Sequence, residues 1–255
     1  MKQRGIWIVC LLALGVLTAG TSLRAQGMDE GKPMYIYVSQ WAVPRAQWGD
    51  MAKRSDSTRA LSDKLVADGT LIGYGEFANL IHQEGEPTHG DWMTADSEGK
   101  LLKALEAFYA QGDVTAPVLA ASKHWDYFLV SRMHKSRSGS FDGAYLSGSR
   151  FQVKPGQGMA FNNLTKSRII PMLDKLLADG SLLFYSVDAE DYHTQPPGVV
   201  EVVMATPDAA AMDKVSDAFE AAFAKDEEIG PAMATLTKGD GHRDFLARIS
   251  HMSSK

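Results

Sequence analysis

A repeat within the chain constrains its fold more than any other feature of the sequence. The stretch from Asp63 to Ala110 aligns without a gap with the stretch from Asp174 to Ala221, at a constant offset of 111 residues. Fifteen of the 48 aligned pairs are identical. An ungapped match of this length at one offset indicates an internal duplication. We therefore expect the chain to fold as two related halves.

Composition and periodicity predict the same order of elements in both halves. Strands are expected near residues 34–39, 70–81, 91–94 and 125–133, and again near 151–153, 181–188, 199–205 and 245–249. Helices are expected near residues 44–67, 96–111, 155–180 and 207–224, with a kink or restart of the third at Pro171. The segment 137–148 is rich in Ser and Gly, which predicts a linker between a first repeat at 34–136 and a second at 149–253.

Each half thus has the β-α-β-β-α-β order of a ferredoxin-like unit, in which both helices cover one face of an antiparallel sheet. The other face must also be buried, because it would otherwise leave a large apolar patch. Two copies in one chain meet this need if their sheets pack face to face. The arrangement resembles the dimeric α+β-barrel superfamily, which includes cofactor-free monooxygenases, haem-degrading enzymes and stress-responsive proteins. The resemblance covers about residues 34–252 and implies an α+β fold in which both halves form one intramolecular barrel.

Residues 1–25 have the pattern of a secretory signal peptide. Lys2 and Arg4 precede an apolar segment at 6–19, and small residues follow as far as Ala25. The apolar segment is shorter than the ~20 residues that cross a bilayer, although an uncleaved anchor is the alternative. Cleavage would remove Cys10, the single cysteine, and with it any disulfide or thiolate site. The sequence therefore predicts a secreted or periplasmic protein without a membrane partner after cleavage.

The charge balance limits the classes of partner. The chain has 26 basic and 31 acidic residues, for a net charge of −5, and the signal segment contributes only basic residues. An acidic chain of this kind is not expected to bind nucleic acid. A small-molecule ligand remains possible, and the chain is predicted to be a monomer or a homo-oligomer.

Two aligned histidines, His82 and His193, are the first candidates for chemistry. Each lies eight residues beyond an aligned tyrosine, Tyr74 or Tyr185, near the end of the second strand of its half. Because side chains alternate along a strand, an even spacing places Tyr and His on the same face. We therefore predict that both pairs, together with Glu76, face the barrel interior, with His as acid or base. The competing interpretation is that the histidines bond loop backbone, and a bulge in the strand would break the parity.

A second aligned pair, His124 and His242, lies at the entrance to the last strand of each half. Asp126 and Asp244 follow two residues later, so each carboxylate could orient an imidazole or share a metal with it. Without cysteine and without a third ligand nearby, no metal site is predicted. The absence of Cys-x-x-Cys-His excludes c-type haem attachment, whereas non-covalent haem with one axial histidine is possible.

Tryptophan is distributed unequally between the halves. Trp41, Trp48, Trp92 and Trp125 all lie in the first half, where the aligned residues of the second are Gln152, Met159, Val203 and Arg243. Either one half keeps a working cavity or the core packing has drifted. We predict Glu76, Trp41, Trp92, His124 and His242 as ligand-binding residues.

Several common catalytic motifs are absent from the sequence, including phosphate-binding glycine loops, Gly-x-Ser-x-Gly and His-Glu-x-x-His. The main hypothesis is therefore a small-molecule-binding or stress-related barrel protein of unknown ligand. One alternative is a cofactor-independent monooxygenase-like or haem-handling enzyme that uses a cavity in the first half. Another is a structural or interaction protein whose barrel is filled by side chains.

Overall fold

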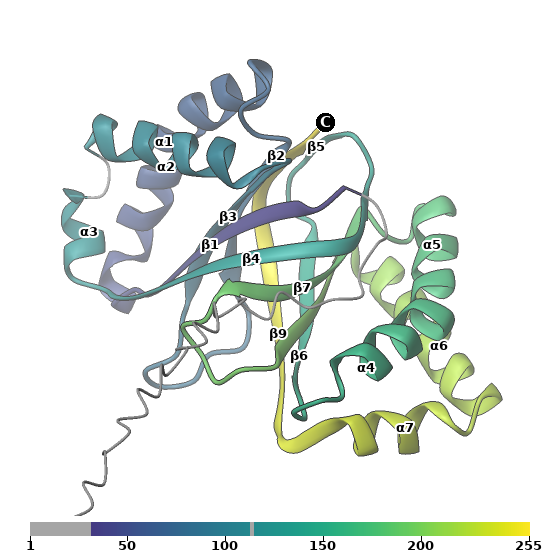
Figure 1. Ribbon diagram of the computed structural model, residues 1–255. Coiled ribbons are helices and arrows are strands. Elements are labelled where there is room, and N and C mark those ends of the chain that lie inside the picture. The colour runs from purple at the N-terminus through teal and green to yellow at the C-terminus, as the bar shows by residue number, and fades with distance from the viewer. Residues whose placement is uncertain (1–31, 113–114) are drawn as a thin grey trace, which may run out of the picture.

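The computed structural model describes residues 32–112 and 115–255 (Figure 1). The predicted signal peptide, residues 1–25, lies outside the described residues. The first half comprises β1 (Met34–Ala42), a 3₁₀ turn (Arg45–Gln47), α1 (Trp48–Ala67), β2 (Gly73–Asn79), β3 (His89–Ala95), α2 (Glu98–Gln111), α3 (Pro117–Ala120) and β4 (Lys123–Ser136). The second comprises β5 (Gly139–Phe141), β6 (Tyr145–Val153), α4 (Gly158–Leu164), a π-helix (Thr165–Ile169), α5 (Ile170–Ala178), β7 (Phe184–Tyr192), β8 (Val199–Thr206), α6 (Ala209–Lys225), α7 (Ile229–Leu236) and β9 (Thr237–Ser254).

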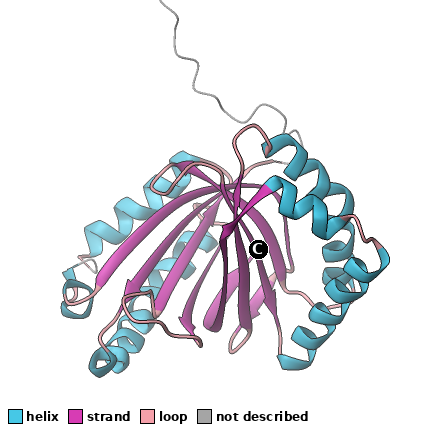
Figure 2. Ribbon diagram, turned by 90° about the horizontal axis from the view of Figure 1, so that it is seen from below, coloured by secondary structure: helices cyan, strands magenta, loops and turns pink. Residues whose placement is uncertain are grey.

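The strands form one closed antiparallel barrel, as Figure 2 shows from below. The order within the first half is β2-β3-β1-β4, and the second half repeats it as β7-β8-β6-β9. The last strand of each half pairs with the second strand of the other, β4 with β7 and β9 with β2. Closure leaves none of these eight strands with an unpaired edge. The predicted α+β class and intramolecular barrel are confirmed.

The helices lie outside the barrel in two groups. α1, α2 and α3 cover the sheet of the first half, and α4 to α7 cover that of the second (Figures 1 and 2). Local sequence sets their ends: the Ser97 side chain accepts a hydrogen bond at the start of α2 and Asp208 does so for α6. Gly69 and Gly180, both at positive φ, follow the last turns of α1 and α5, which is the conformation that glycine adopts most readily.

Apolar side chains form separate clusters on the two faces of the barrel wall. One cluster lies under α1 and α2 and contains Leu71 and Leu101, and another lies under α5 and α6 and contains Leu173 and Val215. A third lies inside the barrel and joins residues of both halves: Phe77, Ala144, Leu146, Leu183, Ala205, Ala247, Ile249 and Met252. The two halves are therefore held together by a shared core as well as by strand pairing.

Two local features of the second half bear on the sequence predictions. The segment 137–148, predicted as a linker, contains β5 and the first residues of β6, because β5 pairs along the end of β9. The helix does not restart at Pro171, because the backbone stays in the αR conformation from the π-helix (Thr165–Ile169) into α5 (Ile170–Ala178). The predicted disturbance takes the form of a π-helical turn directly before Pro171, whose missing N–H cannot form an α-helical hydrogen bond.

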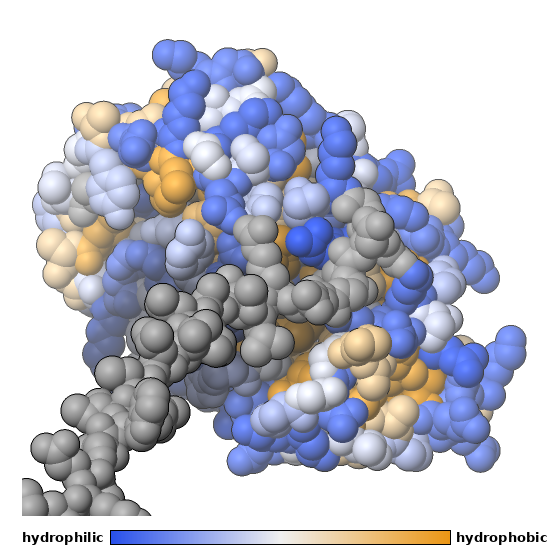
Figure 3. Space-filling view, in the orientation of Figure 1, coloured by the Kyte–Doolittle hydropathy of each residue, from blue (hydrophilic) through white to orange (hydrophobic). Residues whose placement is uncertain are grey.

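The surface in Figure 3 is hydrophilic over much of both helical layers, with apolar residues gathered over α4 and α7. Among residues 32–112 and 115–255, no helix has both the length and the apolar character needed to cross a membrane.

Candidate functional site

The second strand of each half points its tyrosine in the opposite direction to that predicted. The Tyr74 hydroxyl donates a hydrogen bond to Asp63 of α1 at 2.8 Å, and the Tyr185 hydroxyl donates one to Asp174 at 2.5 Å. Both tyrosines, and Glu76 with them, therefore lie under the helices, while Phe77 belongs to the cluster inside the barrel. The prediction that Tyr74, Glu76 and Tyr185 face the barrel interior is wrong.

An even spacing places two residues on the same face of a strand but does not show which face is the interior. Alternation along β2 is regular: Tyr74 and Glu76 face the helices, and Phe77 faces the interior. The strand ends at Asn79, before His82, so the spacing does not align Tyr74 with His82. The register shift opposite Glu76 and Phe77 is a bulge in β9, where Ser250 is the extra residue. Inside the barrel, Gly75 faces the Trp92 ring, which occupies the space that a side chain at position 75 would need.

A cavity of about 310 Å³ lies between the sheet of the first half and helices α1, α2 and α3. Its aromatic and apolar wall comprises Tyr37, Trp41, Tyr74, Met93, Leu105, Phe108, Tyr109, Leu119 and Ala120. Trp92 also borders it, although its ring lies inside the barrel. Its polar wall comprises Ser39, Arg54, Thr58, Ser62, Glu76, Asp91 and His124. The structure thus brings together five of the predicted residues: Tyr74, Glu76, Trp41, Trp92 and His124. We call this space the first-half cavity.

Glu76 lies at the base of the first-half cavity and is only 6% exposed. Its Oε1 accepts a hydrogen bond from the Thr58 hydroxyl at 3.4 Å, and its Oε2 lies 3.5 Å from the Arg59 guanidinium. Burial, and then the negative charge of Asp91, raise the pKa of Glu76 to about 7 against the opposing effect of Arg59 and Arg54. Near neutral pH this carboxyl can therefore either accept or donate a proton.

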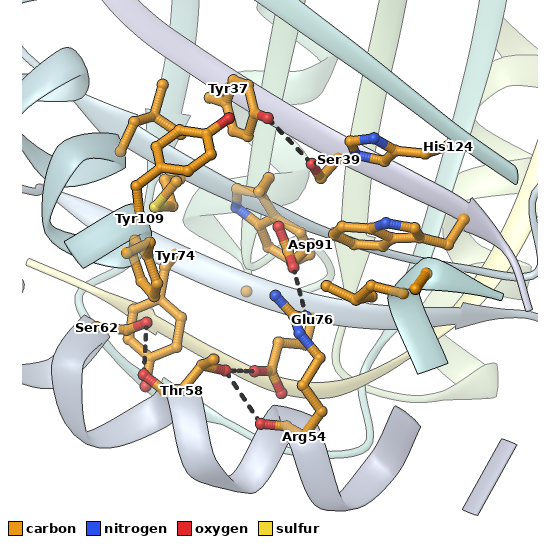
Figure 4. Close-up of a pocket in the computed structure, with 18 residues that line it drawn as sticks. Tyr37, Ser39, Arg54, Thr58, Ser62, Tyr74, Glu76, Asp91, Tyr109 and His124 are labelled. Atoms are coloured by element: carbon orange, nitrogen blue, oxygen red, sulfur yellow. Dashed lines mark hydrogen bonds and ion pairs between the residues drawn. The ribbon is translucent and has the colours of Figure 1, made fainter. Parts of the chain in front are cut away.

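Arg54 connects the acidic base of the cavity to its aromatic wall. Its guanidinium lies 3.3 Å from an Asp91 carboxylate oxygen and 5.1 Å from the centre of the Trp41 ring. Figure 4 shows Arg54 and Thr58 reaching from α1 toward Glu76 and Asp91, with Tyr37 and Tyr109 on the other side. The site therefore has positive charge beside a carboxyl group, which suits a substrate that becomes an anion during reaction.

Ser39, His124 and Asp126 form a hydrogen-bonded group at the edge of the cavity. The Ser39 hydroxyl donates to Asp126 at 2.5 Å, and the same Asp126 oxygen lies 2.9 Å from His124 Nε2. Burial favours a raised pKa for Asp126, but hydrogen bonds from His124, Ser39 and Tyr37 lower it below the ordinary value. In a nucleophilic triad the histidine stands between serine and aspartate. Here serine donates directly to aspartate, so the geometry is not that of a triad.

The second half contains the same group. The Ser149 hydroxyl donates to Asp244 at 2.7 Å, and His242 Nε2 lies 3.2 Å from Asp244. His242 stacks on Phe151 with 4.9 Å between ring centres, as His124 stacks on Trp41 with 5.1 Å.

The strand pairing corrects the sequence alignment at this point. Trp41 pairs with His89, and Phe151 pairs with Val200, which is the residue aligned with His89. Phe151, not Gln152, is therefore the structural counterpart of Trp41. The contrast in aromatic content between the halves is smaller at this position than the alignment suggested.

His82 and His193 lie in the exposed loops after β2 and β7, outside the residues that line the first-half cavity. The His82 ring lies 5.1 Å from the ring of Trp48, which His89 also contacts. Burial, and then the proximity of His82, lower the pKa of His89 to about 4. The structure therefore places His82 and Tyr74 apart and does not form the predicted Tyr–His wall.

Sequence reasoning missed Arg54, Asp91 and Tyr37. A signal for the site was present in the repeat, at positions where polar residues of one half match apolar residues of the other. Thr58, Ser62, Glu76 and Asp91 align with Ile169, Leu173, Val187 and Val202, and all four of these apolar residues belong to the cluster under α5 and α6.

The described residues contain no group of three or more His, Cys, Asp or Glu side chains that could hold a metal ion. The residues of the first-half cavity do not fit haem. His124 is the histidine that lines the first-half cavity, and its Nε2 is engaged by Asp126 and Ser39. The volume of the cavity suits a ligand of two or three fused rings and not a porphyrin macrocycle.

No family model matches the sequence, and no curated protein matches it significantly. Solved structures do resemble it. A candidate monooxygenase from Lactobacillus acidophilus has a TM-score of 0.64 at 10% identity, over 88% of this chain and 96% of that one. A candidate monooxygenase from Fusobacterium nucleatum has a TM-score of 0.65 at 8% identity, over 88% and 95%. An anthrone oxidase-like protein has a TM-score of 0.52 at 12% identity, over 88% and 94%. These similarities show the dimeric α+β-barrel fold.

Proposed function

We propose that the protein is a cofactor-independent monooxygenase that oxidises a fused-ring aromatic substrate in the first-half cavity, with Glu76 as the general base. The observation that carries this proposal is the carboxyl group of Glu76, which is buried at the base of an aromatic-lined cavity with a pKa of about 7. A general base works best when its pKa lies near the working pH.

The wall of the cavity supports an aromatic substrate. Trp41, Tyr74, Phe108 and Tyr109 offer ring faces and edges against which a planar molecule can pack. A volume of about 310 Å³ lies at the small end of the range for ligand pockets, which favours a compact planar substrate. The similarity to structures described as monooxygenases and as anthrone oxidase-like is consistent with this class.

The reaction uses O₂ as the oxidant. The Glu76 carboxylate accepts a proton from an acidic CH₂ group between aromatic rings, and the resulting anion is stabilised by delocalisation and by Arg54, which lines the cavity. The anion transfers its electron pair to O₂, a carbon–oxygen bond forms, and the peroxide takes the proton back. Loss of the second C–H proton then breaks the O–O bond, so that one oxygen atom becomes the carbonyl and the other leaves as water.

The test is oxygen consumption with anthrone as the probe substrate. Glu76→Gln keeps the shape of the side chain but cannot accept the proton, so the rate should fall by about 100-fold or more. Glu190→Gln is the matched control, because Glu190 is also a buried glutamate but belongs to the second half. An unchanged rate in Glu76→Gln, with wild-type unfolding behaviour, would overturn the role of Glu76.

A binding protein without catalysis is the second candidate, and the same cavity supports it. Anthrone that binds to the wild-type protein in a fluorescence titration without consuming O₂ would favour this function. Failure of both binding and turnover would count against an aromatic ligand in the first-half cavity.

We also propose that the protein is secreted or periplasmic, on the strength of the signal-like pattern at residues 1–25. N-terminal sequencing of protein from the periplasmic and cytoplasmic fractions tests this. A mature protein that begins near residue 26 is expected, and a chain that retains Met1 in the cytoplasm would contradict the proposal.

A further inference from the structure

The interior of the barrel holds a second cavity, of about 170 Å³, on the opposite side of the sheet from the first-half cavity. Both halves contribute to its wall, which is mainly apolar and includes Ile36, Phe77, Trp92, Leu146, Phe184 and Phe245. The Trp92 ring lies about midway between Phe77 and Phe184, with ring centres 6.1 and 6.0 Å away. An apolar space of this kind is suited to an aromatic ring.

One carboxyl group interrupts this apolar wall. Asp188, on β7, is 4% exposed and faces the barrel cavity, whereas its neighbour Val187 packs under the helices. Asp188 Oδ2 accepts a hydrogen bond from the Ser186 hydroxyl at 2.9 Å. Asp188 Oδ1 is buried and accepts no hydrogen bond from the described residues. Against the effect of burial, the nearby Ser131 hydroxyl lowers the pKa of Asp188, but its single hydrogen is donated to the Val187 carbonyl oxygen at 2.8 Å. Leaving a buried acceptor unsatisfied is unfavourable, so a ligand that supplies a donor here gains affinity.

The neighbouring charges do not satisfy Asp188. Glu201 lies opposite Asp188 on β8, and it is already held by Arg150, whose Nε lies 2.6 Å from Glu201 Oε1. Burial raises the pKa of Asp188 to about 7, and the charge of Glu201 acts in the same direction. The Arg150 charge is thus directed to Glu201, and Asp188 Oδ1 remains the unpaired polar atom.

The cavity also reaches one mouth of the barrel. Ser136, Ser254 and Lys255 line it together with the apolar residues, and the C-terminus lies beside the ends of the strands (Figure 1). A small ligand can therefore enter from this end without crossing the first-half cavity or the helical layer.

We infer that the barrel interior is a second ligand site, which binds a single-ring aromatic molecule with one hydroxyl or amino donor. The ring lies among Phe77, Trp92 and Phe184, and the donor bonds to Asp188 Oδ1. The size fits, because an engineered apolar cavity of about 150 Å³ in another protein binds benzene. The site is independent of the proposed oxygenase function.

The test is calorimetric titration of the mature protein with phenol, aniline and toluene, supported by Trp fluorescence. Phenol and aniline should bind more tightly than toluene to the wild-type protein. Asp188→Leu, which keeps a similar volume but removes the acceptor, should weaken phenol binding about tenfold, which corresponds to about 1.4 kcal/mol, and leave toluene binding unchanged or tighter.

A second variant distinguishes loss of the acceptor from misfolding of Asp188→Leu. Asp188→Asn retains an acceptor oxygen of the same shape, so it should keep most of the phenol affinity. Anthrone should not displace phenol, because the two probes occupy different cavities. Equal phenol affinity in the wild type and Asp188→Leu would overturn the inference, and so would the failure of all three probes to bind at millimolar concentration, since water alone would then fill the barrel.

Discussion

The two halves of the barrel share their scaffold but differ in what lies beneath their helices. In both, a tyrosine of the second strand donates a hydrogen bond to an aspartate of the preceding helix, and a Ser–His–Asp group joins the first strand to the last. Beneath the helices, the first half has a cavity with Glu76 and Asp91, while the second half has Val187 and Val202 in an apolar core.

This difference distinguishes features that serve the scaffold of both halves from features that mark a site in one half. A contact that occurs in both halves, including the half whose space under the helices is filled, serves the common scaffold. A polar residue present in one half and replaced by a buried apolar residue in the other marks a specialised site. The Tyr–Asp and Ser–His–Asp contacts, which occur in both halves, belong to the first kind, and Glu76 belongs to the second.

The largest expected effect compares the packing of matched helix positions. Leu173 is fully buried in the second half, and Leu173→Ala should lower the free energy of unfolding by about 2–5 kcal/mol through the cavity that it leaves. Ser62→Ala, at the matched position facing the first-half cavity, should lower it by no more than about 1 kcal/mol, because it leaves no large void and loses one hydrogen bond to the Thr58 carbonyl oxygen. Urea denaturation of both variants measures the difference. Equal losses would show that the first half is packed like the second.

The second prediction concerns Glu76, a buried carboxyl at a position where the second half has Val187. Because the folded state raises the pKa of Glu76 from 4.5 to about 7, its stabilising effect is complete below pH 4.5 and is lost as pH rises toward 7. Relative to Glu76→Gln, the wild-type protein should therefore lose about 3 kcal/mol between pH 4 and pH 8.

Denaturation curves across this pH range provide the measurement. Comparison with Glu76→Gln removes the contribution of Asp188, which titrates in both proteins. A stability difference between the two proteins that stays flat with pH would mean that Glu76 ionises as an ordinary exposed carboxyl, and it would remove the electrostatic contrast between the halves.

A smaller effect is expected from the tyrosine–aspartate contacts that both halves share. Tyr74→Phe and Tyr185→Phe should each cost about 1 kcal/mol, because each loses one hydrogen bond to a partly exposed carboxylate. The two losses should be equal within error in urea denaturation. A loss of turnover in Tyr74→Phe without a matching change in stability would instead give this tyrosine the catalytic role predicted from the sequence.

The smallest effects are expected at the exposed loop histidines. His82→Ala and His193→Ala should each change the free energy of unfolding by less than about 0.5 kcal/mol. Oxygen consumption with anthrone should be unchanged in both, since neither residue lines the first-half cavity. If His82→Ala alone abolished turnover, the catalytic assignment of His82 would be restored and the cavity boundary would need revision.

The duplication, the order of elements and the closure of two sheets into one barrel could be predicted from the sequence. These depend on local patterns and on the burial of apolar faces, and the repeat shows the same pattern in both halves. Part of the cavity wall was also predicted, since Trp41, Glu76, Trp92 and His124 all border it. The direction of Tyr74 and Glu76 was not, because alternation along β2 shows which residues share a face but not which face lies under the helices.

The sequence by itself therefore determined the architecture, because strand order and face-to-face burial follow from hydrophobic periodicity within each half. Only the tertiary structure decided where the cavities lie and which groups meet in them. Glu76, Arg54 and Asp91 come from different elements, and Asp188 faces a space enclosed by strands of both halves. The burial that raises the pKa values of Glu76 and Asp188 exists only once helix, sheet and barrel have closed around them.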